Sequence, residues 1–197
     1  MELRLVGSEM CIRDRIPIDL TNYSEFQKLM RTLIQANSIE SIREIWWDVR
    51  PHPGYGTVEI RVCDSIPDLK VIQDLAALIQ ALVVGLCRHY KNGTQLPYLD
   101  TWIIHENKWR ATRYGIDAKL ILDSDGNQED ITTVIKDTIF ALEPEINNLK
   151  ISESMDRIIS GIDSRHSYYK EQIKLYNKNK SFKDLISTSV EMFKNSI

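Results

Sequence analysis

Several residue types are scarce in this 197-residue chain, and each scarcity narrows the class of protein. The three cysteines are odd in number and lack C-x-x-C spacing, and the four histidines are scattered without a metal-binding pair. A disulfide framework and a zinc site are therefore disfavoured. A reduced, cytoplasmic protein is the simplest expectation.

Excess charge and long apolar runs are also missing. The net charge is -3, so the chain as a whole has no attraction for nucleic acid or anionic lipid. No run approaches the roughly 20 apolar residues of a membrane span. The longest apolar stretch, 76–87, is interrupted by Gln80 and predicts a buried helix. We therefore expect neither a nucleic-acid nor a membrane partner.

The composition that remains is typical of a globular domain, with 43% hydrophobic and 27% charged residues. Residues 1–15 show no clean period, and the run VGSEMCIRDR resembles translated sequencing-adapter read-through. A flexible N-terminal arm is the alternative interpretation. We expect the folded domain to comprise residues 16–197.

Hydrophobic periodicity predicts an α+β fold with more helix than strand. The first helix should begin at a cap, Asn22 or Ser24, and run through Ile34. The other expected helices are 68–90, 99–114, 130–143, 152–162, 165–177 and 181–195, and the expected strands are 45–50, 57–63 and 118–122. Because two strands do not make an independently stable sheet, this pattern indicates that partner strands are missing.

The loop DSDGNQED (123–130) superficially resembles a calcium-binding loop because Asp123, Asp125 and Asn127 alternate. An EF-hand needs glycine at its sixth position and glutamate at its twelfth, where this chain has Gln128 and Val134. A calcium site is therefore not expected.

The segment 45–64 carries a concentration of charge on a predicted hairpin. Alternation along a strand places Asp48 and Arg50 on one face, and Glu59 and Arg61 on the matching face of the next strand. If the loop spans 51–56, Asp48 lies opposite Glu59, and two facing carboxylates need positive charge between them. Diagonal arginines could supply it as solvated ion pairs. A magnesium ion could also supply it, with Arg61 binding a phosphoryl group.

A second charged stretch, 105–115, lies on the predicted helix 99–114. Helical spacing brings Glu106, Arg110 and Arg113 within reach of one another, with Asn107 nearby. Trp109 lies beside this cationic face, where it could stack on a flat ring such as a nucleobase. The alternative is an ordinary surface helix with a Glu106–Arg110 pair and Trp109 in the core.

The two stretches together resemble a known family. WWDVRPHPGYGTVEIRVCD (46–64) is similar to the D-x-R-P-x-P-x-x-G-T-x-E-x-R-x-x-D signature of the type 2 glutamate–cysteine ligases. This family includes the YbdK-type carboxylate–amine ligases. ENKWRATRYGIDA (106–118) resembles the family's second block, E-N-x-W-x-A-x-R-x-G-x-D.

The resemblance implies part of a glutamine synthetase-like fold, with antiparallel strands backed by several helices. It also implies ATP-dependent joining of a glutamate γ-carboxylate, or a similar carboxylate, to an amine such as cysteine through a γ-glutamyl phosphate. Glu59 would be the Mg²⁺ ligand and Arg61 would bind the transferred phosphoryl group. Asp48 and Arg50 would support them. Further groups would line the nucleotide or substrate side, namely Asn107, Arg110 and Arg113.

The resemblance covers only the family's C-terminal half, so we expect this chain to be an incomplete and inactive fragment of a ligase. One alternative is a non-catalytic module that binds a nucleotide or phosphate, and another is an interaction protein with a solvated hairpin face. The sequence leaves the amine substrate open. A homodimer is compatible with the apolar helix 68–90, although we find no heptad repeat that fixes one.

Overall fold

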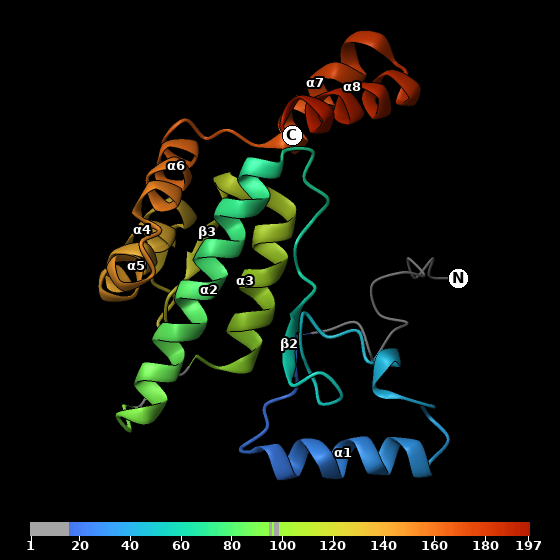
Figure 1. Cartoon of the computed structure of the whole chain (residues 1–197), viewed down its shortest axis with the longest axis vertical. Coiled ribbons are helices and arrows are strands. Elements are labelled where there is room, and N and C mark those ends of the chain that lie inside the picture. Colours follow the sequence, from blue (N-terminus) through green and yellow to red (C-terminus); the bar gives the residue numbers. More distant parts are fainter. Residues whose placement is uncertain (1–15, 95, 97–98) are drawn as a thin grey trace. The chain divides into compact units, whose positions relative to one another are not determined.

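The computed structural model describes residues 16–94, 96 and 99–197, which form two compact units, up to Asp64 and from Ser65 onward. Of the described residues, 63% are helical, and they include two small antiparallel sheets, so the expected α+β class is confirmed (Figure 1). The prediction for residues 1–15 lies outside the described residues.

The first unit combines one helix with a β-hairpin. Its elements are α1 (Tyr23–Gln35), the 3₁₀ turn η1 (Ile42–Glu44), β1 (Val49–His52) and β2 (Thr57–Ile60). The side chain of Asn22 accepts a hydrogen bond from the Glu25 backbone N–H, which confirms Asn22 as the cap of α1. A small apolar core joins α1 to the segment before β1 and consists of Phe26, Met30, Ile39, Ile45 and Trp47.

The second unit is mainly helical. It contains α2 (Leu69–Lys91), α3 (Thr101–Tyr114), η2 (Gly115–Asp117), β3 (Lys119–Ile121), β4 (Gln128–Asp130), α4 (Ile131–Ala141), α5 (Glu143–Leu149), α6 (Ser152–Asp163), α7 (Tyr168–Asn179) and α8 (Phe182–Asn195). Most of these match the predicted helices and the predicted strand at 118–122. Strand β4 lies in the segment expected to be a loop, and the short helix α5, which begins at Glu143 with Pro144 in its first turn, was not predicted.

One face of α2 builds the core of the second unit. Ala81 is fully buried, and an apolar cluster surrounds it that includes Ile139, Leu142 and Met155. Gly85 lets the start of α5 approach, because a Cβ at this position would lie 2.6 Å from the side chain of Leu142, the residue just before that helix. Helix α2 therefore packs closely along one side against α5 and α6.

Most of α2 is nevertheless not buried, in contrast to the prediction. The helix is long and apolar enough, by length and composition alone, to cross a membrane, and 17% of its most apolar window is buried. The sequence-based expectation counted only uninterrupted apolar residues and treated Gln80 as a break. It therefore underestimated the length of the apolar part of α2. Core helices of soluble proteins meet the same criterion of length and composition.

Two ion pairs fasten α2 to its neighbours. Arg157 on α6 donates through Nε and Nη2 to the buried Asp74 carboxylate, at 2.9 and 2.7 Å. Arg88 pairs with the buried Glu145 of α5. The hydrogen bond from Arg157, opposed by desolvation, lowers the pKa of Asp74 below its usual value.

We predict that Asp74→Asn lowers the free energy of unfolding at about pH 7 by roughly 2–3 kcal/mol, because the Arg157 guanidinium loses its buried charged partner and keeps only the exposed Glu153. A carboxyl with a lowered folded-state pKa stabilises the fold above its unfolded pKa of about 3.9, and this stability is lost as the pH falls through the folded-state pKa. Urea unfolding followed by circular dichroism at neutral and acidic pH measures both effects.

Asp156→Asn, an exposed position on α6, is the matched control and should leave stability unchanged. Equal losses in both variants would contradict a specific role for the Asp74–Arg157 pair.

Candidate functional site

The hairpin pairs in a register different from the one predicted. Arg50 lies opposite Glu59, and His52 lies opposite Thr57, so the connecting loop is the four residues 53–56. The expected pairing of Asp48 with Glu59 is therefore wrong, because β1 continues through Pro51 and His52 rather than ending at Arg50. A proline can occupy a strand that has one open edge, since it loses only one backbone donor. The result replaces a like-charge pair with an opposite-charge pair.

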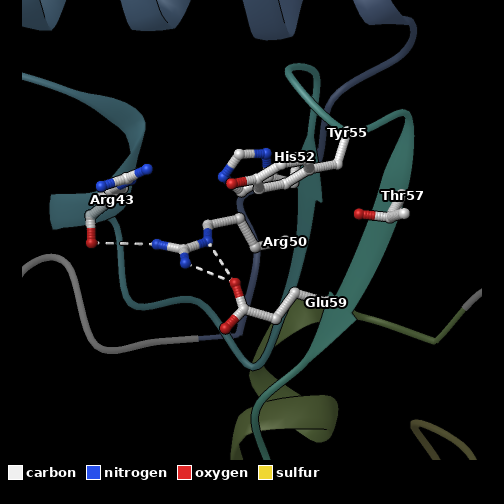
Figure 2. Close-up of a pocket in the computed structure, with 6 residues that line it drawn as sticks. All are labelled: Arg43, Arg50, His52, Tyr55, Thr57 and Glu59. Carbon is white, nitrogen blue, oxygen red and sulfur yellow. Dashed lines mark hydrogen bonds and ion pairs between the residues drawn. The ribbon is translucent and has the colours of Figure 1, made fainter.

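Arg50 is the most constrained side chain of the hairpin, with 4% of its surface exposed. Its Nη1 donates to three backbone carbonyls of the segment before the strand, those of Ile42, Arg43 and Ile45, at 3.0, 3.1 and 2.6 Å. Its Nε donates to Glu59 Oε2 at 3.1 Å, and its Nη2 also contacts that oxygen (Figure 2). Arg50 therefore joins the η1 turn to both hairpin strands.

Glu59 lies between two guanidinium groups. Oε2 accepts from Arg50, and Oε1 accepts from Arg61 Nη1 at 2.7 Å. The hydrogen bonds from Arg50 and then Arg61 lower the pKa of Glu59 below its usual value. The Asp48 backbone carbonyl accepts a hydrogen bond from the Arg61 backbone N–H at 2.7 Å. Asp48 and Arg61 therefore extend the backbone hydrogen bonding of the hairpin beyond the pair of Arg50 and Glu59. The three charged groups are Arg50, Glu59 and Arg61, and we call them the hairpin triad.

A cleft of about 410 Å³ lies over the hairpin. It is lined by Arg43, Arg50, His52, Tyr55, Thr57 and Glu59. The ring of Tyr55 stacks on that of His52 with centroids 4.5 Å apart (Figure 2). Among these lining residues the charge is two arginines against one carboxylate, and the volume falls in the range of small-ligand sites. The cleft is thus suited to an anionic ligand.

A second cleft, of about 380 Å³, lies beside α3 in the other unit. Its residues are Glu106, Trp109, Arg110, Tyr114, Asp117, Lys119 and Gln128. Arg110 pairs with Glu106 through Nε at 3.0 Å and donates from Nη1 to the Lys119 carbonyl and the Gln128 side chain. Trp109 is 53% exposed, so its alternative placement in the core is wrong.

The remaining two predicted residues on α3 differ in their surroundings. Asn107 donates to the Ile121 carbonyl and accepts from the Ile121 N–H, both at 2.8 Å, so its amide pairs with β3 as a neighbouring strand would. Arg113 is exposed on the last turn of α3. Asn107 therefore supports the strand that borders the second cleft, while Arg113 does not line it.

Known proteins resemble the chain over most of its length. The model of glutamate–cysteine ligase family 2 matches residues 12–166. The chain belongs to glutamate–cysteine ligase family 2. The matched range includes both clefts, whereas α7 and α8 lie beyond it.

Curated relatives agree with this membership of family 2. A protein of Frankia alni named "Putative glutamate--cysteine ligase 2-1" is 37% identical over 157 residues, covering 80% of this chain and 41% of the relative. Proteins named "Putative glutamate--cysteine ligase 2" in Bdellovibrio bacteriovorus and Thermobifida fusca are 32% and 35% identical, covering 92% and 90% of this chain. The chain spans less than half the length of these relatives, 41–48%.

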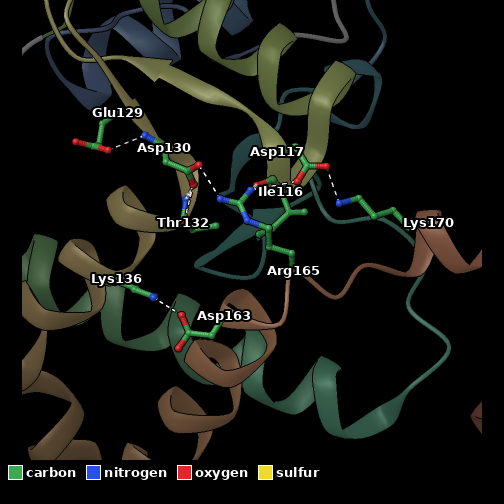
Figure 3. A network of polar contacts seen from close by, with 9 residues as sticks. All are labelled: Ile116, Asp117, Glu129, Asp130, Thr132, Lys136, Asp163, Arg165 and Lys170. Carbon is green, nitrogen blue, oxygen red and sulfur yellow. Dashed lines mark hydrogen bonds and ion pairs between the residues drawn. The ribbon is translucent and has the colours of Figure 1, made fainter.

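A polar network in this family 2 chain was not anticipated among the candidate site residues. Arg165 donates to the Ile116 carbonyl, to Asp117 and to Asp130, and Lys170 pairs with Asp117 at 2.6 Å (Figure 3). Asp117 also lines the second cleft, and its pKa is lowered by hydrogen bonds from Lys170 and Arg165. The partners are 35 to 53 residues apart in the sequence, so no local spacing pointed to the network.

The fit of the hairpin cleft to magnesium depends on Glu59. Across the described part of the chain, no three His, Cys, Asp or Glu side chains come together as a metal-binding group. Mg²⁺ in phosphoryl-transfer sites is held by one or two carboxylates and completed by water and phosphate oxygens. Two nitrogens of Arg50 contact Glu59 Oε2, whereas Oε1 accepts from Arg61 alone and retains a lone pair, so the carboxylate fits as one such ligand through Oε1.

We predict that Arg50→Met lowers the free energy of unfolding by about 3 kcal/mol, because three backbone carbonyls lose their buried donor. Urea unfolding followed by tryptophan fluorescence is the measurement, because Trp47 is buried in the core of this unit whereas Trp102 and Trp109 of the other unit are already exposed. Arg31→Met, at an exposed position of α1, is the control and should unfold like the wild type. An unchanged midpoint in Arg50→Met would show that the hairpin triad does not hold the unit together.

Proposed function

We propose that the chain is part of an ATP-dependent carboxylate–amine ligase that joins the γ-carboxylate of glutamate to an amine such as cysteine. The observation that supports this proposal most directly is the hairpin triad, whose Glu59 and Arg61 occupy the E-x-R positions of the ligase signature in a chain belonging to family 2. The printed names of the relatives are in line with it.

The reaction has two chemical steps. A carboxylate oxygen of glutamate attacks the terminal phosphorus of ATP, which releases ADP and forms a mixed anhydride, γ-glutamyl phosphate. The amine nitrogen then attacks the carbonyl carbon, inorganic phosphate leaves with the electrons of the C–O bond, and the nitrogen loses a proton. Catalysis of such steps consists mainly of positioning and of stabilising negative charge.

The hairpin triad provides side chains for both tasks. Arg61 is 40% exposed and contacts Glu59 through Nη1 alone, so its other donors remain available to a phosphoryl oxygen. Glu59 is proposed as a ligand for Mg²⁺, which would neutralise the phosphoryl charge when bound. Arg50 is too enclosed to bind substrate, and its role is to fix the orientation of Glu59.

The second cleft is assigned to the nucleotide or substrate side. Trp109 presents an exposed ring edge-on to Tyr114, at 5.8 Å between centroids, next to the Arg110 guanidinium. An exposed aromatic ring beside a cation suits a flat ligand that carries negative charge. Asn107 supports the strand that borders this cleft, whereas Arg113 is exposed and does not line it. We also propose a cytoplasmic location, because the proposed reaction requires ATP. The free thiols of Cys63 and Cys87 agree with the reducing conditions of that compartment.

We further propose that the chain is the C-terminal half of the ligase and is inactive by itself. It matches less than half of each relative's length, and Glu59 is the single carboxylate among the residues lining the hairpin cleft. The genomic reading frame upstream of Ile16 should therefore encode about 170–200 further residues, a typical domain length, with more metal-binding carboxylates. A start codon immediately before Ile16 would contradict the fragment proposal.

The alternative is a module that binds a nucleotide or phosphate without catalysis. The same single carboxylate favours it, since a site with one protein ligand holds Mg²⁺ weakly. The two proposals differ in whether the full-length protein that contains this chain turns over ATP when glutamate and an amine are present.

In that full-length protein, we predict that Arg61→Ala lowers kcat by at least about a hundredfold, because a donor to the transferred phosphoryl group is lost.

Glu59→Gln keeps an acceptor for Arg50 but loses the anionic metal ligand, so activity should fall and half-maximal activity should require more Mg²⁺. Phosphate release with glutamate and cysteine as substrates, at varied Mg²⁺, is the measurement.

Arg31→Ala is the matched control, because it also removes an exposed arginine from the first unit. Unchanged turnover in Glu59→Gln would rule out the metal assignment. Binding of ATP without any turnover in the wild type would favour the non-catalytic module.

A further inference from the structure

The segment 165–170, which joins α6 to the first turn of α7, lies against one wall of the second cleft. Asp117 of this wall is bound through both of its oxygens. Oδ1 accepts from Arg165 Nη1 at 3.1 Å, and Oδ2 accepts from Lys170 Nζ at 2.6 Å (Figure 3). The Arg165 guanidinium also donates to the Ile116 carbonyl at 3.2 Å. Two cations that do not line the cleft themselves therefore hold the η2 turn.

The same guanidinium reaches a second carboxylate, at the start of α4. Arg165 Nη2 donates to Asp130 Oδ2 at 2.8 Å, while Asp130 Oδ1 accepts from the Thr132 backbone N–H and caps α4. Asp130 also lies opposite Lys119 in the β3–β4 pair, and Lys119 lines the second cleft. Arg165 thus connects the η2 turn, the end of β4 and the start of α4.

A tyrosine of the same segment contacts the end of α3. The ring of Tyr169 lies against Gly115, because a Cβ at position 115 would be 2.7 Å from the Tyr169 Cε1 atom. The Tyr169 hydroxyl donates to the Tyr114 carbonyl at 3.4 Å. Tyr114 in turn meets the Trp109 ring edge-on in the cleft. The cleft wall from 114 to 117 is therefore supported from behind by the first turn of α7.

Arg165 occupies a backbone position that ordinarily suits glycine. Its φ is 47°, in the left-handed region. The Arg165 N–H donates to the Ile162 carbonyl and the His166 N–H donates to the Gly161 carbonyl, which together form a Schellman motif at the end of α6. The left-handed residue of that motif is usually glycine, because a Cβ there is strained. A strained arginine points to a use of its side chain, and the contacts with two carboxylates provide one.

We propose that Arg165 is a positioning residue for the second cleft, where it fixes Asp117 and the η2 turn with Lys170 as the second cation. The inference rests on the proposed function in one respect, the assignment of a nucleotide to this cleft. Because the Arg165 side chain is 45% exposed, its ion pairs add little to the free energy of unfolding. Their effect is orientation, since a carboxylate held through both oxygens keeps one position for a ligand.

The test uses the full-length protein that contains this chain. Arg165→Gly removes the guanidinium and at the same time relieves the backbone strain, so the Tm should be equal to or above that of the wild type. The KM for ATP should rise by about tenfold or more, because the wall of its cleft is displaced. The value of kcat should change little, because Glu59 and Arg61 are held by the hairpin. Phosphate release and thermal unfolding are the measurements.

Lys170→Met is a second variant, which leaves the backbone at Arg165 as it is. It removes the cation on Asp117 Oδ2, so the KM for ATP should rise less than in Arg165→Gly, because Arg165 still binds Oδ1. Amide hydrogen exchange of the segment 114–118, followed by mass spectrometry, reports on the η2 turn without any substrate. Exchange there should be faster in both variants than in the wild type.

Lys150→Gly is the matched control. Lys150 is also a non-glycine residue in the left-handed region, with φ 58°, and it lies exposed at the end of α5. Its replacement by glycine relieves the same kind of strain at a position that does not line the second cleft. Hydrogen exchange of the segment 114–118 and the KM for ATP should therefore equal those of the wild type.

The positioning role and the proposed function can fail separately. Unchanged exchange of the segment 114–118 in Arg165→Gly would overturn the positioning role. So would an active Arg165→Gly enzyme whose KM values for ATP, glutamate and cysteine are all unchanged. Faster exchange in Arg165→Gly, with a wild type that turns over no ATP, would support the positioning role and reject the proposed function. A higher KM for glutamate or cysteine instead of ATP would support it and place that substrate in the second cleft.

Discussion

The first unit depends on the guanidinium of Arg50. A two-stranded hairpin has too little apolar contact to hold itself, and here one buried side chain joins both strands to the preceding turn. Because its donors are used by three carbonyls and a carboxylate, Arg50 carries its charge into the interior without leaving an unpaired group. The same contacts fix Glu59, so the fold of this unit and the geometry of its cleft have a common cause.

In the second unit, too, buried ion pairs determine how one element packs against its neighbours. Helix α2 is apolar on two sides, and the ion pairs of Asp74 and Glu145 determine which side faces α5 and α6. An apolar face alone has no preferred rotation about the helix axis, whereas a buried carboxylate is stable only against its arginine. Charged residues therefore orient a helix whose hydrophobic residues would allow two orientations.

The sequence was informative where local periodicity decides structure. The cap at Asn22, the α3 helix and the two charged motifs of family 2 were predicted from spacing and resemblance. The hairpin register was not, because a loop of four residues and one of six leave the same alternation of side chains and differ only in their cross-strand partners.

Contacts between residues distant in the sequence could not be predicted from it either. Nothing in the stretch 105–115 showed that Asn107 would pair with the backbone of Ile121, or that Trp109 would remain exposed. The Arg165 network joins residues dozens of positions apart, which a single sequence does not relate. Assignment of Glu59 to metal and of Arg61 to phosphate continues to rest on family resemblance, and Glu59, unlike Arg61, also lines the cleft.

The two arginines that hold Glu59 have a consequence for its coordination chemistry. The lowered pKa keeps the Glu59 carboxylate ionised at more acidic pH than an ordinary glutamate, so a cation that binds it there has no proton to displace. Its affinity for a divalent ion would then be set by competition with Arg61 rather than with hydrogen ions. Each oxygen is already oriented by a hydrogen bond, so binding there requires little reorganisation of the hairpin.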